Sequence, residues 1–161
     1  MKNQLILILF SILLYGCSEA EAETPILELT GVYTNESDTN YANTLDQLPT
    51  LSVGDEIDIS FYLNGNGNNL RSFVLKNNNS AIKTKFFFYG DDISDDFSDL
   101  TNGVVGFVDI PETEIAVKAT ILEVTEENPV LSFYLSSKAV NCEGASFKLE
   151  IPVGEKVVNN E

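Results

Sequence analysis

The sequence lacks histidine and tryptophan altogether, and it holds two cysteines among its 161 residues. Without histidine, neither a Ser-His-Asp triad nor a Cys-His pair can form, and no metal site can have an imidazole ligand. Without tryptophan, an aromatic surface for a sugar must be built from tyrosine and phenylalanine. These absences favour a protein that is not an enzyme and that holds no resident cofactor.

Basic residues are scarce as well, because 9 lysines and arginines stand against 25 acidic residues, which gives a formal net charge of −16. Binding to nucleic acid depends on Lys and Arg side chains that neutralise phosphates, and anionic lipid head groups repel an acidic surface for the same reason. We therefore expect no nucleic-acid partner.

The first 16 residues have the composition of an export signal. Lys2 gives a short basic start, and an uncharged run of eleven residues, apolar except for one serine, covers Leu5–Tyr15. This order predicts a secretory signal peptide over residues 1–16. A membrane-spanning helix needs about 20 apolar residues, so this run is too short to remain in the bilayer.

The leader ends in Leu14-Tyr15-Gly16-Cys17, which resembles the lipobox of bacterial lipoproteins. In that family the cysteine thiol receives a diacylglyceryl group, the peptidase cuts before the cysteine, and the new amine is acylated. The resemblance implies that Cys17 is the lipidation site. Its acyl chains, such as palmitate, contribute about 0.8 kcal/mol per buried methylene and would anchor the protein in the outer membrane.

Residues 17–24 form the lipidated cysteine and an acidic tether with three glutamates and no residue able to join a core. Such a segment is extended by its own charge and reaches about 25 Å. It resembles the surface-export signal of Bacteroidota lipoproteins, and a plain solvated linker is the equal alternative. A domain is expected over residues 25–154, and a flexible tail over 155–161.

The second cysteine, Cys142, lies beside Glu143 in the sequence Asn-Cys-Glu-Gly. The neighbouring carboxylate disfavours the thiolate form that reactive cysteines need. With Cys17 lipidated, a single remaining thiol makes neither an internal disulfide nor a structural zinc site. We expect Cys142 to be an unreactive residue of a turn or strand end.

Apolar and polar residues alternate along much of the chain, and turn residues separate the runs. In Glu56–Leu63 every second residue is apolar, which is typical of a half-buried strand. The same pattern recurs at 130–137 and 146–153, and weaker strands are expected at 26–34, 70–76, 81–89, 104–110 and 114–124. These runs predict an all-β fold, namely an immunoglobulin-like antiparallel β-sandwich of about seven to eight strands preceded by the signal peptide.

The connection Asn64–Asn69 contains only asparagine and glycine. These residues tolerate the positive φ angles that hairpin turns require. We therefore predict that strands 56–63 and 70–76 are antiparallel neighbours in one sheet.

The lipobox, the acidic tether and the sequence Leu-Ser-Val-Gly-Asp-Glu-Ile at 51–57, followed by the Asn/Gly-rich connection, carry a family resemblance. Together they resemble small uncharacterised Bacteroidota lipoproteins with an immunoglobulin-like domain. The resemblance covers most of the chain after the leader. It implies a binding or assembly role at the cell envelope and no catalytic residues.

The densest acidic segment is a candidate calcium site, with five carboxylates at Asp91, Asp92, Asp95, Asp96 and Asp99. Calcium prefers several oxygen ligands, but the spacing does not match an EF-hand loop. Instead, Asp91, Asp95 and Asp99 would line one face of a short helical turn. A solvated acidic loop is therefore favoured over a metal site.

The sequence Phe86-Phe87-Phe88-Tyr89 offers a candidate partner patch. If Phe86 and Phe88 point to the core, strand alternation turns Phe87 and Tyr89 outward. These two rings either form a surface for a ligand or partner, or lie under the long connection 35–49, which contains Tyr41 and Leu45. We favour coverage, because exposed aromatic patches are uncommon on monomers.

Three function classes follow from these features. The first is a membrane-tethered β-sandwich that binds an unknown envelope protein or glycan without catalysis. The second is a structural subunit of a surface assembly, which requires an exposed sheet edge for strand addition. The third is a calcium-stabilised module.

Overall fold

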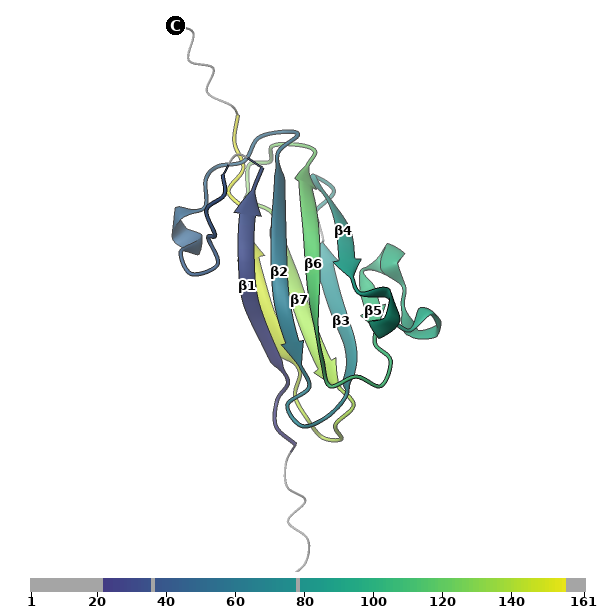
Figure 1. Cartoon of the computed structure of the whole chain (residues 1–161). Helices are drawn as coiled ribbons and strands as arrows, with labels where there is room; N and C mark the ends of the chain where they lie inside the picture. Colours follow the sequence, from purple (N-terminus) through teal and green to yellow (C-terminus); the bar gives the residue numbers. More distant parts are fainter. Residues whose placement is uncertain (1–21, 36, 78, 156–161) are drawn as a thin grey trace, which may run out of the picture.

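The computed structural model describes residues 22–35, 37–77 and 79–155, so the leader and Cys17 lie outside the described residues. In the described part, two four-stranded antiparallel sheets pack face to face as a sandwich (Figure 1). The strands are β1 (Ile26–Thr34), β2 (Glu56–Asn64), β3 (Leu70–Asn77), β4 (Ile82–Phe88), β5 (Val104–Gly106), β6 (Glu112–Ile121), β7 (Val130–Ser137) and β8 (Ala145–Glu150). The predicted all-β class is confirmed.

The strand order is immunoglobulin-like. One sheet has the order β1-β2-β6-β4, and the other has the order β5-β3-β7-β8. In an immunoglobulin constant-type domain, strands A, B, E and D form one sheet, and C, F and G form the other. The chain follows this scheme, with the short strand β5 added beside β3. The predicted immunoglobulin-like sandwich is therefore confirmed.

Four predicted strands end earlier than expected, among them 81–89, which ends at Phe88, and 114–124, which ends at Ile121. The segment 104–110 is a strand only as far as Gly106, because the chain turns and Val108 donates its backbone N–H to Asp92. The segment 146–153 is a strand only as far as Glu150, and Pro152 follows with no N–H to donate.

A cluster of phenylalanines joins the two sheets. Phe61 on β2 lies 4.7 Å from Phe133 on β7, and both rings lie within 6.0 Å of Phe73 on β3, measured between ring centroids. All three side chains are completely buried. In antibody domains these same three strands carry the inter-sheet disulfide and the tryptophan that packs on it. Aromatic packing thus takes the place of a covalent link between the sheets.

The predicted hairpin between 56–63 and 70–76 is wrong, because β2 and β3 belong to different sheets. The connection crosses the sandwich and is fixed at both ends to the segment before β6. Gly65 donates its N–H to Pro111, and Leu70 donates to Ile110. A Cβ on Gly65 would lie 1.9 Å from the Asn68 carbonyl oxygen, so the tight bend requires glycine. Six residues are enough to cross the roughly 10 Å between packed sheets.

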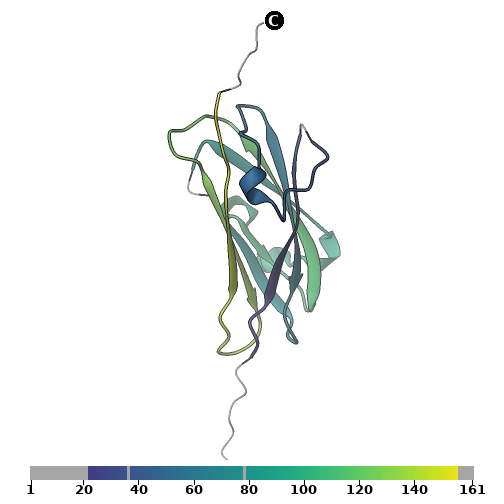
Figure 2. The same cartoon turned by 90° about the vertical axis from the view of Figure 1, so that its left-hand side faces the viewer.

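The described chain enters the sandwich at one end, where β1 begins, and leaves toward the opposite end after β8 (Figures 1 and 2). The strands therefore run along the axis that joins the two ends. Among the described residues, no helix has the length and apolar character needed to cross a bilayer.

Candidate functional site

The outer face of the β1-β2-β6-β4 sheet contains a row of three small residues that ends at Phe87 on the edge strand. The strand register places Gly31, Ser60, Ala116 and Phe87 side by side across the four strands. Because Ser60 and Ala116 have short side chains, the sheet surface is hollowed there to a volume of about 320 Å³. We call this hollow the aromatic depression, and its lining includes Thr30, Ser60, Phe87, Tyr89, Glu114 and Ala116.

Two aromatic side chains form one wall of the aromatic depression. Phe87 is 44% exposed and Tyr89 is 63% exposed. They are alternate residues of one extended segment, so their side chains lie on the same face and their Cα atoms are about 7 Å apart. The ammonium group of Lys85 lies 4.9 Å from the centroid of the Phe87 ring, a cation–π contact that helps to hold this ring in place.

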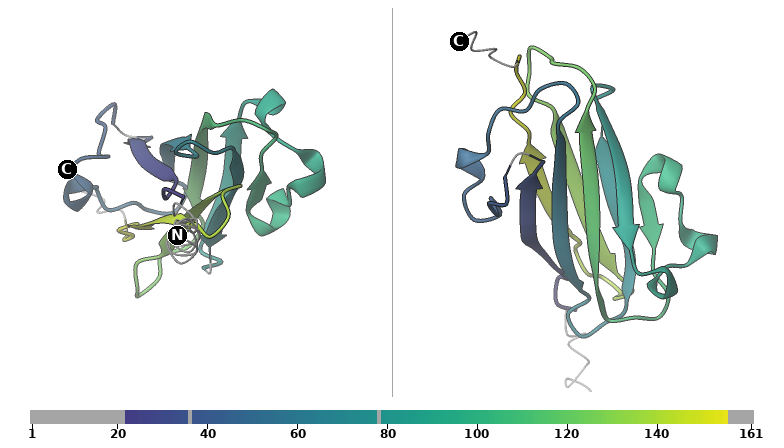
Figure 3. Two further views of the ribbon diagram at one scale, coloured as in Figure 1. Left: turned by 90° about the horizontal axis from the view of Figure 1, so that it is seen from below. Right: turned by 45° about the horizontal axis from the view of Figure 1, so that its top comes forward.

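The interpretation that the connection 35–49 covers this wall is wrong. The connection packs on β1, where Tyr41 donates its backbone N–H to Val32 and the side chain of Asn40 donates to Thr30. This is one edge of the sheet, whereas β4 forms the other edge, and β2 and β6 lie between them (Figure 3). Phe86 packs against the core as expected, so the outward orientation of Phe87 is confirmed, and the described part of the connection 35–49 does not cover it.

Carboxylates surround one end of the aromatic depression. Tyr62 lies between Glu28 and Glu114 in the strand register. Its hydroxyl donates a 2.5 Å hydrogen bond to Glu112, and Asn64 donates to the same carboxylate oxygen at 3.0 Å. The Glu112 hydrogen bond raises the pKa of Tyr62 above its usual value. This end of the face therefore carries negative charge and disfavours an anionic ligand.

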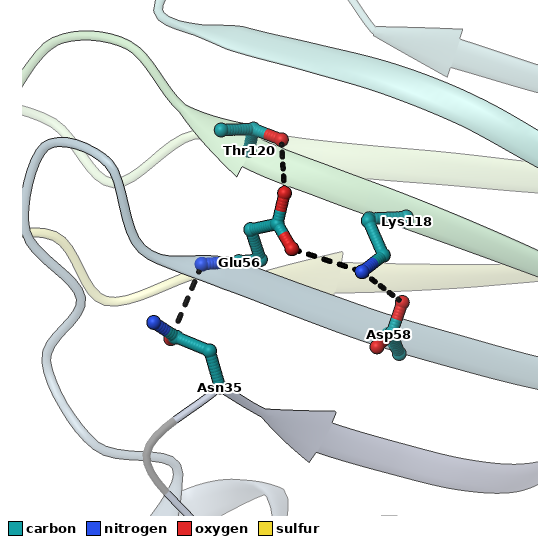
Figure 4. Close-up of polar contacts among 5 residues, drawn as sticks. All are labelled: Asn35, Glu56, Asp58, Lys118 and Thr120. Atoms are coloured by element: carbon teal, nitrogen blue, oxygen red, sulfur yellow. Dashed lines mark hydrogen bonds and ion pairs between the residues drawn. The ribbon is translucent and has the colours of Figure 1, made fainter.

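The other end of the face is an internally paired polar cluster (Figure 4). Lys118 lies 2.9 Å from Glu56 and 3.6 Å from Asp58, and Thr120 donates a 3.4 Å hydrogen bond to Glu56. The hydrogen bond from Lys118 holds the pKa of Glu56 below its ordinary value, and the same contact raises the pKa of Lys118. Lys118 is thus neutralised by its neighbours on the sheet.

The Glu56 contact predicts a pH dependence of stability. Since the pKa of Glu56 is lowered on folding, its contribution is present above the unfolded value of about 4.5 and is lost as pH falls through the folded value. The variant Glu56→Gln should therefore be less stable than the wild type at neutral pH, with the gap closing in acid. Urea denaturation of the variant and the wild type, at neutral and at acidic pH, measures this difference in stability. The exposed control Glu123→Gln should show no such closing gap, and an equal pattern in both variants would contradict the prediction.

The family of the chain is shown by its sequence. A domain of unknown function, DUF5035, matches residues 17–153, which is most of the chain. The protein belongs to the DUF5035 family. No curated protein matches the sequence.

Two solved structures are similar to this DUF5035 protein. One is a DUF4466 family protein from Parabacteroides merdae, with 15% identity, a TM-score of 0.49, and coverage of 81% of this chain and 45% of that one. The other is a type II cohesin domain from the cellulosome of Acetivibrio cellulolyticus, with 17% identity, a TM-score of 0.33, and coverage of 84% and 92%. The DUF5035 chain thus spans less than half the length of the DUF4466 protein.

The acidic segment of the DUF5035 domain does not form one helical face. It is divided into separate 3-10 turns, namely η2 (Gly90–Asp92), η3 (Asp95–Phe97) and η4 (Leu100–Asn102). Ile93 lies between the first two turns and forms an antiparallel bridge with Phe107. The expectation that Asp91, Asp95 and Asp99 share one face is therefore wrong.

The five carboxylates of this segment have separate roles and surroundings. Asp99 accepts hydrogen bonds from the backbone and side chain of Asn102, which lower its pKa, and Asp92 accepts one from Thr113. Asp91, Asp95 and Asp96 lie exposed in the first two turns. Within the residues that the structure describes, no three acidic or thiol side chains are grouped to hold a metal ion.

Cys142 lies in the connection between β7 and β8, as expected for a turn or strand-end residue. Its thiol donates a hydrogen bond to the carbonyl oxygen of Glu23 at 3.1 Å. The start of the described chain therefore lies against this connection.

The floor of the aromatic depression was not predicted from the sequence. Ser60 and Ala116 are ordinary outward residues of alternating strands, and only the register brings them together. Glu114 likewise becomes part of the site through pairing of β6 with β2. The signal that could have found this floor is a small residue at an outward position of each of two strands that are predicted to pair.

Proposed function

We propose that this DUF5035 protein is a non-enzymatic binding module, anchored in the outer membrane through lipidated Cys17, whose aromatic depression receives a partner of the cell envelope. The observation that carries the proposal is the exposure of Phe87 and Tyr89 beside a floor of small side chains. Large aromatic side chains gathered at a concave surface of a monomer usually mark a binding site.

The anchor is supported by the order of the leader and by the family match, which begins at Cys17. A tether at the start of β1 would hold the sandwich by one end. The aromatic depression lies on the side of the sandwich, on the outer face of a sheet whose strands lie along the axis that joins the two ends. It would therefore stay accessible to a partner when the chain is anchored.

A structural subunit that assembles by strand addition has less support. β8 is an edge strand, which such an assembly would use. It has six residues and carries the exposed Lys148 in its second half. Short edge strands with lysine oppose the addition of another strand. β5 forms the other edge of the β5-β3-β7-β8 sheet. An antiparallel bridge between Ile93 and Phe107 lies next to β5.

Photo-cross-linking in intact cells tests the proposal. A photoreactive phenylalanine analogue placed at Tyr89 should give a product of higher mass in the envelope fraction. The matched control is the same analogue at Phe97, which is 75% exposed and lies outside the aromatic depression. Equal products from both positions, or none from position 89, would contradict the proposal.

A further inference from the structure

We propose that the aromatic depression binds an uncharged glycan, stacked on Phe87 and Tyr89. This inference rests on the proposed function and names its ligand class. The faces of these rings carry partial negative charge, whereas the C–H groups of a sugar ring are weakly positive and apolar. Phe87 and Tyr89 are alternate residues of one extended segment, with Cα atoms about 7 Å apart, and their side chains form a platform along which a sugar chain can lie.

The polar groups around the platform suit a ligand rich in hydroxyl groups. The hydroxyls of Thr30 and Ser60 and the carboxylate of Glu114 line the aromatic depression. A hydroxyl donates and accepts, and a carboxylate accepts, so this set matches the mixed donors and acceptors of a sugar. A sugar ring that stacks its apolar face on the two aromatic rings would have these polar groups within the same depression.

The size of the site argues against a folded protein as the ligand. A volume of about 320 Å³ is at the lower end of the range for small-ligand sites. A stable protein interface buries about 800 Å² on each partner, with an apolar centre. Here the large exposed apolar side chains of the site are Phe87 and Tyr89, and the lining beside them includes the small or polar residues Thr30, Ser60, Glu114 and Ala116. A short stretch of polysaccharide fits these dimensions.

The charge of the site selects among glycans. Glu28, Glu112 and Glu114 lie on the same face, and the chain as a whole carries a net charge of −16. On the same face, Lys118 is paired with Glu56 and Asp58. Lys85, whose ammonium group lies over the Phe87 ring, is one cation beside these three carboxylates. Glycans that carry uronate, sulfate or phosphate are therefore repelled, and uncharged polysaccharides are not.

Affinity electrophoresis of the full chain in detergent tests the inference. Gels contain a neutral polysaccharide (β-glucan, mannan or xylan), an acidic one (alginate) or a basic one (chitosan). We expect retardation by a neutral polysaccharide and none by alginate. Phe87→Ala and Tyr89→Ala should each weaken binding roughly ten-fold, and the double variant should show no retardation.

The control variant is Phe97→Ala, which removes an exposed ring from outside the aromatic depression and should bind like the wild type. Circular dichroism spectra confirm that each variant is folded. Failure to bind any neutral polysaccharide, binding only to alginate or chitosan, or unchanged binding by the double variant would overturn the glycan assignment.

The two proposals fail in different ways. If no glycan binds, but Phe87→Ala abolishes the envelope cross-link formed from position 89, the aromatic depression is a binding site and the glycan assignment is wrong. If Phe87→Ala changes neither glycan binding nor the cross-link, both proposals are wrong.

Discussion

Replacing Phe133 with alanine is expected to lower the free energy of unfolding by about 3–5 kcal/mol. The side chain is completely buried on β7, and its ring contacts Phe61, Phe73 and Phe147 at centroid distances of 4.7, 6.0 and 6.2 Å. Truncation therefore removes apolar contacts to both sheets and leaves a cavity. Because a domain of ordinary size has a free energy of unfolding of only about 5–15 kcal/mol, this variant should lose much of its stability or fail to fold.

Urea denaturation followed by circular dichroism measures the effect. Phe97→Ala is the matched control, because the Phe97 side chain is 75% exposed and its removal should change stability by no more than about 0.5 kcal/mol. Phe133→Leu keeps most of the apolar volume and should fall between the two. Equal midpoints for Phe133→Ala and Phe97→Ala would show that the phenylalanine cluster does not hold the sheets together.

The strands could be predicted because the sequence of each strand shows which of its residues are buried. A strand with one face on the core has a period of two, which is visible in residues such as Ile57, Ile59 and Phe61 without knowledge of any partner. The alternation also oriented Phe86 and Phe87 correctly. Local pattern thus determined the fold class, the approximate strand positions and, for the most regular strands, the side that faces the core.

The partners of the strands were not predictable in the same way. The connection Asn64–Asn69 has the residues of a hairpin turn, but it crosses between sheets because β2 pairs with β6 and β3 pairs with β7. The same limit affected the aromatic depression, since coverage of Phe87 depends on which edge the connection 35–49 reaches. Register between distant strands is a property of the whole core, and a local motif does not contain it.

Replacing Cys17 with serine is expected to move the protein from the membrane fraction to the soluble fraction. A serine hydroxyl is not the thiol that lipid transfer to bacterial lipoproteins requires, so both the proposed acyl anchor and the cleavage before position 17 should be lost. Two or more acyl chains give stable membrane attachment, whereas the acidic chain, with a net charge of −16, has little other affinity for anionic lipid. If the uncleaved leader holds the variant on the membrane, alkaline extraction and a larger mass distinguish it from the lipidated form.

Fractionation with a clickable palmitate analogue measures this outcome. The control is Cys142→Ser, which changes the other thiol of the chain and should retain both the label and the membrane location. Label retained by Cys17→Ser and lost by Cys142→Ser would place the lipid on the sandwich itself, and the aromatic depression would then have a different position relative to the membrane.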